Sequence, residues 1–153
     1  MGDVVSQSIE IDAPIEEVWE LIMDPDRLGE WVTIHKDVSE VPVGKLKKGS
    51  RFRQEMKLKG VPLKVRWEVT ECRRPRRARW QGTAAAGAKA RIAYDLKPSG
   101  SGTRFDYENE FELPAGKVGR LAGRAFNAVS GDREAKKSLA RLKDLLENAA
   151  DDR

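Results

Sequence analysis

The chain has 153 residues, of which 35% are charged, with 29 Lys and Arg against 25 Asp and Glu and a net charge of +4. That length suits a single domain over residues 1–153, which buries roughly 70% of its unfolded surface on folding. The small positive charge favours solubility without requiring an anionic partner. One cysteine, Cys72, excludes an intrachain disulfide, and neither a signal peptide nor an apolar run of roughly 18 residues is visible. We therefore expect a cytoplasmic protein without a membrane span.

The first elements are a strand and two helices. Residues 4–11 alternate between apolar and polar side chains, which predicts a half-buried strand. Pro14, followed at once by acidic residues and an apolar stripe, predicts the start of a helix. Asp24-Pro25 ends this helix and starts a second short one, because Asp24 can cap it and Pro25 suits its first position. The second helix is expected to run to about Trp31.

Alternation then returns in a series of strands separated by short breaks. Turn residues occupy these breaks, for example Gly60 and Pro98-Ser99-Gly100. Gaps of this length favour hairpins and an antiparallel meander. The six predicted strands cover residues 32–41, 50–59, 61–72, 76–84, 88–97 and 102–113.

The period becomes helical from about 116 to 148, and a helix of that length would extend over roughly 48 Å. Ser130-Gly131-Asp132 is expected to kink or interrupt it, since glycine and serine are poor helix formers. The order is therefore one strand, two helices, six strands and one long helix. A seven-stranded antiparallel sheet must cover its apolar face, and only the long helix is large enough to do so.

Three segments resemble a known superfamily: SIEIDAPIEEVWELIMDPDRLGEW near the start, GKLKKGSRF in the middle and REAKKSLARLKDLLE near the end. They are similar to the SRPBCC, START-related helix-grip proteins, and most of all to the polyketide cyclase/dehydrase and lipid-transport branch. The resemblance implies an α+β helix-grip fold, in which a seven-stranded antiparallel sheet wraps around a long C-terminal helix. It also implies a cavity between sheet and helix that binds hydrophobic molecules. Some members are cyclases or aromatases, and the family has no universal catalytic motif to transfer.

Strand alternation separates an inner from an outer face and explains the segment RRPRRARW at residues 73–80. Arg77 and Arg79 are expected to point outward and Trp80 inward. The basic outer face is interpreted either as a solvated sheet face or as a binding surface for RNA, the ribosome or another anion. Nucleic acid is disfavoured as a partner, because no aromatic side chain interleaves with these cations. The predicted outer cations are Arg51, Arg53, Lys57, Lys64, Arg66, Arg77, Arg79 and Arg91.

The inner face is apolar apart from Gln54, Tyr94, Tyr107 and Asn109, which either satisfy one another or contact a ligand. Trp31 ends the second helix, near the expected opening, so it is a candidate gate, whereas Trp19 is expected in the core. The small residues at 84–88 either leave room for a ligand or form a hairpin. The candidate ligand-binding residues are Trp31, Phe52, Gln54, Met56, Trp67, Trp80, Tyr94, Tyr107, Asn109 and Phe126.

Groups for catalysis are few. His35 is the only histidine, and alternation places it with outward residues, so we expect it to be exposed. Arg73 and Arg74 could lower the pKa of Cys72, but no histidine lies near it in sequence, and a structural thiol is favoured. One His and one Cys far apart predict no metal site, and no cofactor motif is present.

The predicted function is the binding of a hydrophobic or aromatic small molecule, lipid or polyketide-like, without a cofactor. The first alternative is a polyketide cyclase/dehydrase-like enzyme in which Tyr94, Tyr107, Gln54 and Asn109 stabilise an enolate. The second is an interaction protein acting through the basic outer face. No catalytic residue is assigned, and the oligomeric state is left open.

Overall fold

The computed structural model describes residues 3–58, 60–112 and 128–151. Its elements follow the predicted order, with bounds that differ from the expected ones by a few residues. They are β1 (Asp3–Ile11), α1 (Ile15–Ile22), a 3₁₀ turn (Pro25–Arg27), α2 (Leu28–Trp31), β2 (His35–Ser39), β3 (Arg51–Leu58), β4 (Val61–Arg73), β5 (Arg77–Thr83), a second 3₁₀ turn (Ala85–Gly87), β6 (Lys89–Ser99), β7 (Gly102–Glu112) and α4 (Ala128–Asp151).

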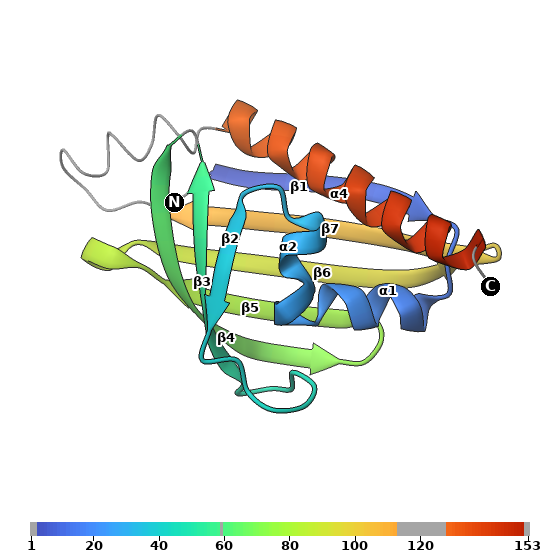
Figure 1. The fold of residues 1–153 in the computed structure, drawn as a ribbon, viewed down its shortest axis with the longest axis horizontal. Helices are drawn as coiled ribbons and strands as arrows, with labels where there is room; N and C mark the ends of the chain where they lie inside the picture. Colours follow the sequence, from blue (N-terminus) through green and yellow to red (C-terminus); the bar gives the residue numbers. More distant parts are fainter. Residues whose placement is uncertain (1–2, 59, 113–127, 152–153) are drawn as a thin grey trace.

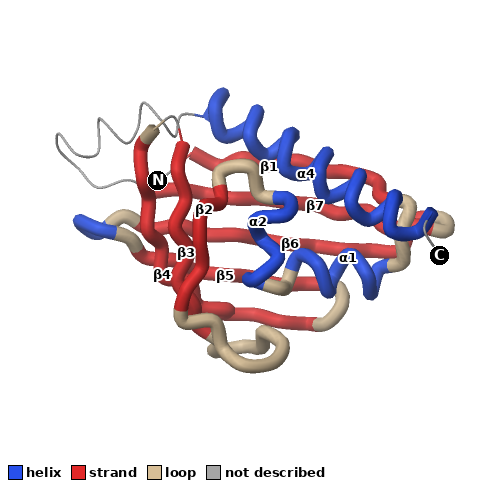
Figure 2. The backbone as a smooth tube through the Cα atoms, in the orientation of Figure 1, coloured by secondary structure: helices blue, strands red, loops and turns tan. Residues whose placement is uncertain are grey.

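The strands form one seven-stranded sheet in the order β1-β7-β6-β5-β4-β3-β2, and every neighbouring pair is antiparallel. The sheet curls, so that β2 and β3 stand across the ends of the longer strands (Figure 1). Helices α1, α2 and α4 lie on the inner side of this curl, and α4 runs along β1 and β7 (Figure 2). The predicted α+β helix-grip architecture is confirmed.

The start of the second helical segment follows the predicted capping. The Asp24 carboxylate accepts a hydrogen bond from the backbone N–H of Asp26 at 3.1 Å, and Pro25 occupies the first turn. Helix α1 buries Trp19 against the sheet, where only 2% of its surface is exposed, so the predicted core role is confirmed. Helix α2 follows this capped turn directly and packs against α4.

Helix α4 passes through Gly131 without interruption, so the expected break at residues 130–132 is wrong. A Cβ atom at Gly131 would lie 2.9 Å from Cγ2 of Val5 on β1. The glycine is therefore explained by the close approach of helix and strand rather than by a bend. The earlier part of the predicted helix, residues 116–127, lies outside the described residues.

Two β-bulges disturb the alternation. The pairing of β2 with β3 shifts register between His35 and Asp37, and that of β4 with β5 shifts between Val69 and Glu71. Each bulge inserts one residue, so the side chains beyond it point to the opposite face from the one that strict alternation predicts. These shifts alter the environments of His35 and Cys72.

Candidate functional site: a cavity between the sheet and helix α4

A cavity of about 70 Å³ lies between the inner face of the sheet and α4. The sheet supplies most of its wall, α2 and the loop after it supply one side, and α4 supplies another. Its lining residues are Val5, Leu28, Trp31, Val32, Ile34, Gln54, Met56, Trp67, Trp80, Ile92, Tyr94, Tyr107, Asn109, Phe111, Gly131, Glu134, Ala135 and Ser138.

The structure brings most of the sequence-predicted site residues to this wall. Two of the predicted residues are not among the lining residues. Phe52 packs edge-on against Trp80, with ring centroids 5.3 Å apart, and does not line the cavity. Phe126 lies outside the described residues. Sequence reasoning missed the lining residues of α4, because alternation along strands carries no information about which helix residues meet the sheet. The predicted residues that line the cavity are Trp31, Gln54, Met56, Trp67, Trp80, Tyr94, Tyr107 and Asn109.

Tyr94 lies at the centre of an aromatic cluster in the wall. Its ring centroid is 5.3 Å from that of Trp80, 6.3 Å from that of Trp31 and 5.9 Å from that of Tyr107. These are the offset and edge-to-face separations that aromatic pairs prefer. Trp31 is only 1% exposed, so it is part of this wall rather than a side chain at a solvent-facing opening.

Gly82 on β5 makes room for this cluster. A Cβ atom there would lie 2.4 Å from Cγ1 of Val65 and 2.8 Å from Cε3 of Trp67. Both neighbours are buried on β4, so neither has free space to move into. The small residues at 84–88 form the β5–β6 connection and are absent from the described lining of the cavity.

A chain of hydrogen bonds runs from the cavity wall through β3 to β2. Trp67 Nε1–H donates to Gln54 Oε1 at 2.8 Å, and Gln54 Nε2 lies 2.9 Å from His35 Nδ1. An indole nitrogen can only donate, so the amide oxygen of Gln54 must face Trp67 and its NH₂ group must face the imidazole. His35 Nδ1 is therefore an acceptor, which makes the ring neutral with its proton on Nε2.

The expectation that His35 is exposed is wrong, because the bulge after it turns its side chain towards the inner face. The ring is half-buried and lies close to α2, where a Cβ atom at Gly29 would be 3.2 Å from its Cδ2. Burial lowers the pKa of His35 below its ordinary value, and the negative charge of Asp37 partly offsets this. Both the buried position and the Gln54 contact favour the neutral ring.

A second polar pair lies on β7, where Asn109 Nδ2–H donates to Tyr107 Oη at 2.7 Å. Burial raises the pKa of the Tyr94 hydroxyl well above its usual value. Burial also raises the pKa of Tyr107, although the hydrogen bond from Asn109 partly opposes the shift. Both hydroxyls are therefore protonated at neutral pH and can donate hydrogen bonds.

The loop after α2 is tied to α4 beside the cavity. The backbone N–H of Thr33 donates to Ser138 Oγ at 3.1 Å, and the Thr33 hydroxyl donates to Glu134 Oε2 at 2.5 Å. Glu134 and Ser138 both line the cavity, as do Val32 and Ile34 on either side of Thr33. These hydrogen bonds close the wall between the loop and the helix.

Cys72 shows no sign of an activated thiol. It is partly buried after the β4 bulge, and its Sγ lies 3.8 Å from the carbonyl oxygen of Leu46. Burial raises the pKa of Cys72, so the idea that Arg73 and Arg74 lower it is wrong. Among the described residues, no group of three His, Cys, Asp or Glu side chains is arranged to hold a metal ion.

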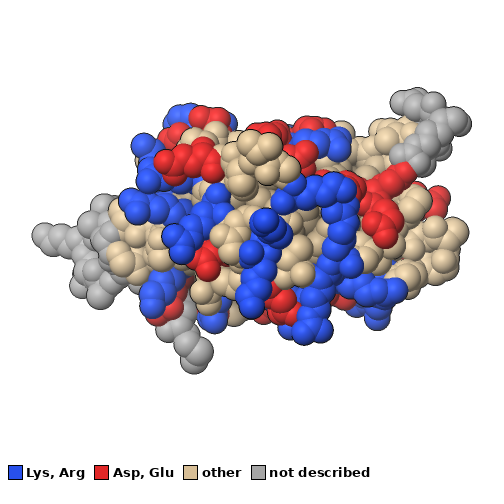
Figure 3. All heavy atoms as spheres, turned by 90° about the horizontal axis from the view of Figure 1, so that it is seen from below, with Lys and Arg blue, Asp and Glu red and all other residues tan. Residues whose placement is uncertain are grey.

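The outer face of the sheet carries the expected cations, and many of them form ion pairs. Lys and Arg side chains spread over the side seen in Figure 3, with Asp and Glu between and beside them. Among the pairs, Arg77 Nε lies 3.0 Å from Glu71, and Arg91 contacts Glu110. Arg79 is half-buried against Asp95 rather than free in solvent. Such pairing lowers the positive potential that an RNA or another polyanion would require.

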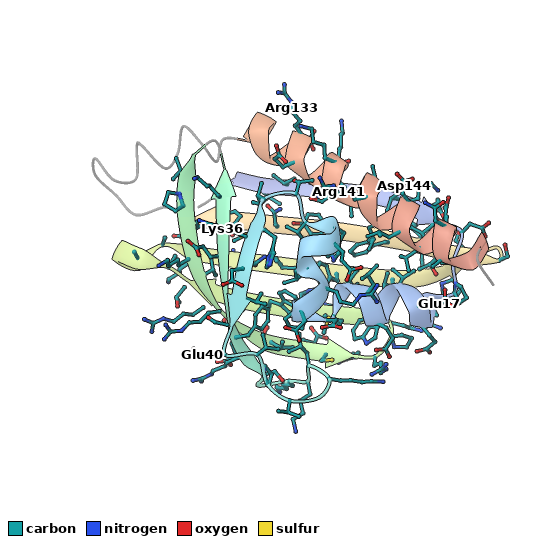
Figure 4. The ribbon with its side chains drawn as sticks, in the orientation of Figure 1. Glu17, Lys36, Glu40, Arg133, Arg141 and Asp144 are labelled. Atoms are coloured by element: carbon teal, nitrogen blue, oxygen red, sulfur yellow. The ribbon has the colours of Figure 1, made fainter. Side chains whose placement is uncertain are left out.

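A separate groove runs between α1 and α4, away from the cavity. Its lining includes Glu17 from α1 with Arg141 and Asp144 from α4, which Figure 4 labels. In the same view Arg133 projects from the start of α4, away from the sheet. The charged side chains of α4 thus lie away from the cavity, apart from Glu134 at its edge.

No helix in the described part of the chain has the length and apolar character to cross a membrane.

The curled sheet, the long helix across it and the aromatic cavity between them define a helix-grip protein of the SRPBCC type. A family model described as polyketide cyclase/dehydrase and lipid transport matches residues 3–147, so the chain belongs to that family. Toxin Rv0910 of Mycobacterium tuberculosis is 27% identical over 126 residues, which are 81% of this chain and 88% of that protein.

Two further similarities cover almost the whole chain. The protein Rv1546 of Mycobacterium tuberculosis is 28% identical over 145 residues, covering 93% of this chain and 99% of its own. The crystal structure of TTHA0849 from Thermus thermophilus superimposes with a TM-score of 0.73 at 21% identity, covering 96% of this chain and 99% of that one. At this level of identity the structural match supports the fold alone.

Proposed function

We propose that the protein binds a hydrophobic or aromatic small molecule in the cavity between the sheet and α4. The observation that carries the proposal is the composition of the wall, in which tryptophan, tyrosine and aliphatic side chains surround a few oriented polar groups. Small-molecule sites are typically apolar concavities with a small number of placed hydrogen-bonding groups. The family description, which includes lipid transport, supports the same function.

The cavity volume requires part of the wall to move when a ligand enters. About 70 Å³ accommodates roughly two water molecules at about 30 Å³ each, whereas ligand pockets usually measure about 300–1,000 Å³. The loop that follows α2 is held to α4 by hydrogen bonds from Thr33 to Glu134 and Ser138. If the cavity opens at this contact, polar contacts break and the aromatic contacts are kept. In this proposal the loop separates from α4 and the aromatic cluster stays in place.

The direct test is native mass spectrometry of freshly purified protein beside its denatured mass. A bound ligand appears as one discrete added mass that is lost on denaturation. If the protein shows no added mass and also fails to bind a panel of hydrophobic probes, the proposal is wrong.

Filling the cavity supplies a matched test. Ala135 is buried on the cavity side of α4, whereas Ala140 is exposed on the same helix. We expect Ala135→Phe to weaken probe binding at least tenfold, because its ring would occupy more than the existing cavity. Ala140→Phe should leave the dissociation constant unchanged, as measured by fluorescence titration. Equal effects of the two substitutions would place binding elsewhere.

A cyclase-type reaction is the second candidate, favoured by the two protonated tyrosine hydroxyls in the wall. Tyr94 and Tyr107 stack at 5.9 Å and could donate hydrogen bonds to an enolate that forms from a carbonyl-rich substrate. In this candidate Tyr94→Phe abolishes turnover while ligand binding persists. If wild-type protein returns a bound polyketone chemically unchanged, cyclisation of that substrate is excluded.

A further inference from the structure

We propose that the loop between β2 and β3 docks the protein onto an anionic lipid bilayer. The apolar tip of this loop, residues 41–43, enters the boundary between headgroups and acyl chains, and exposed cations beside it contact the headgroups. These features lie outside the cavity, so the inference does not rest on the proposed function.

The tip of the loop exposes an apolar side chain to solvent. Val43 is 105% exposed, and the other large apolar side chain that is exposed in the described residues is Val4, at 47%. Next to the tip, Gly44 has a φ of +87°, and a Cβ atom there would meet nothing within 4 Å. Val43 therefore projects from the surface. A single exposed valine is ordinary, so its surroundings decide what it means.

Exposed cations from two segments of the chain lie near this tip. Three lysines follow it within the loop, and three arginines lie at the turn between β4 and β5. These residues are Lys45, Lys47, Lys48, Arg73, Arg74 and Arg76, and all of them are exposed. Together with residues 41–43 they are called the docking patch.

Contacts hold the loop and the turn side by side. Lys45 Nζ lies 3.1 Å from Glu20 Oε1, and the guanidinium group of Arg74 contacts the same oxygen. Cys72 Sγ lies 3.8 Å from the carbonyl oxygen of Leu46, and Arg74 lines the same groove as the tip. The patch lies on the side of the molecule away from α4 (Figure 1), and the view from that side shows Lys and Arg side chains beside uncharged surface (Figure 3).

The docking patch keeps an excess of positive charge. The carboxylates near it are Glu20 and Glu71, which pair with its cations, and Asp24 and Asp26, which line the groove under the tip. Lys47, Lys48 and Arg76 form no ion pair with any described residue. In contrast to the ion-paired outer face of the sheet, the patch therefore offers cations that an external anion can use.

The combination of an apolar tip with these cations matches a bilayer better than a nucleic acid. Proteins that lie on membranes bury apolar side chains at the interface and attract anionic lipids with basic ones, and a single weak anchor gives only marginal binding. Binding to single-stranded nucleic acid instead uses exposed aromatic rings on which bases stack. Trp19, which lines the groove under the tip, is buried and cannot serve in this way.

The first test is sedimentation of the wild-type protein with lipid vesicles. Vesicles of phosphatidylcholine alone are compared with vesicles that also contain about 30% phosphatidylglycerol. We expect the anionic vesicles to bind at least about tenfold more tightly, because each net positive charge near the surface adds attraction. Most of this binding should be lost at about 1 M salt, where the screening length is about 3 Å.

Two pairs of variants locate the contact. Lys47→Glu with Lys48→Glu should weaken binding to the anionic vesicles about tenfold or more. Lys136→Glu with Lys137→Glu is the matched control, because it changes the net charge equally at exposed positions on α4, away from the patch (Figure 1). Val43→Ser should weaken binding about threefold, through the loss of apolar burial, whereas Val4→Ser should not.

Fluorescence reports whether the tip enters the lipid. All four native tryptophans are buried, so Val43→Trp adds one exposed indole to a background that vesicles do not reach. The emission of this variant should shift to shorter wavelength with anionic vesicles and stay unchanged with phosphatidylcholine alone. The same substitution at Val4 supplies the control.

Each outcome decides the inference. If wild-type protein binds neither kind of vesicle at low salt, or binds mixed-sequence RNA but not vesicles, bilayer docking is excluded while the proposed function of the cavity stands. Binding that the two lysine pairs weaken equally would show attraction by net charge alone and overturn the assignment to this loop. Binding without a shift in the Val43→Trp emission would overturn insertion of the tip. Wild-type sedimentation needs no variant, so a substitution that unfolds the protein does not remove the test.

Discussion

The inner and outer faces of the sheet are built from the same strands but hold together in different ways. On β5, Trp80 points inward with 1% of its surface exposed, while Gln81 beside it is exposed on the outer face. The inner face packs the rings of Trp80, Phe105 and Tyr107 around Tyr94, with centroids 5.3, 5.4 and 5.9 Å from its own. The outer face places charged side chains opposite one another, as in the pair of Arg51 and Glu68 at 3.0 Å.

The comparison teaches where stability and specificity reside. Burial of a large apolar side chain contributes about 1.5–3 kcal/mol, whereas an exposed ion pair contributes about 0–1 kcal/mol. On the inner face Gln54 is paired with Trp67 and Asn109 with Tyr107, whereas Nε1 of Trp31 and of Trp80 has no acceptor among the described residues. We therefore expect substitutions on the inner face to change stability and binding, and those on the outer face to change little.

The largest expected effect is the truncation of Trp80. Trp80→Ala removes a ring that contacts Phe52, Trp67 and Tyr94 and should lower the free energy of unfolding by about 3–5 kcal/mol. Gln81→Ala, on the other face of the same strand, should change it by no more than about 0.5 kcal/mol. Urea denaturation of both variants measures the difference. Similar losses at the two positions would contradict the division into faces.

A smaller effect is expected from the titration of His35. Its pKa is lowered in the folded protein, so the unfolded chain takes up a proton at a higher pH than the folded chain does. The neutral His35 therefore contributes to the free energy of unfolding above about pH 6.5. This contribution is lost as the pH falls from there through the lowered pKa of the folded protein. Protonation also removes the acceptor at Nδ1 that Gln54 uses.

The variant His35→Gln separates this effect from other titrations. It should show a smaller loss of stability than the wild type between about pH 7.5 and about pH 5, measured by urea denaturation. Carboxylates with a lowered pKa, such as Glu71 beside Arg77, lose their contribution only below their ordinary pKa of 4.5. An identical pH profile for variant and wild type would show that His35 does not titrate differently on folding.

The smallest effect is expected on the outer face. A double-mutant cycle on Arg51 and Glu68 should give a coupling energy of about 0.2–1 kcal/mol, because Arg51 is largely exposed and Glu68 is partly exposed. The coupling should decrease further at about 1 M salt, where the screening length is about 3 Å. A coupling above about 2 kcal/mol that resists salt would mean that this face is more than a solvated surface.

Alternation predicted the faces correctly where the strands are regular and failed beyond the bulges. In β3 it assigned Phe52, Gln54 and Met56 to the inner face, and all three are buried. In β2 it placed His35 outside, but the register shift turns the ring inward to Gln54. A bulge adds one residue, and a pattern with a period of two contains no signal for that addition.

The sequence by itself determined the order of the elements, the helix-grip class and most of the residues on the inner wall. Periodicity and turn residues encode these features locally, and the capping at Asp24 is of the same kind. Only the tertiary structure decided that α4 contributes Glu134 and Ser138, that Trp67 is satisfied by Gln54, and that Trp31 and Trp80 are not satisfied. These facts depend on contacts between residues far apart in the chain, where each partner is set by the packing of helix on sheet.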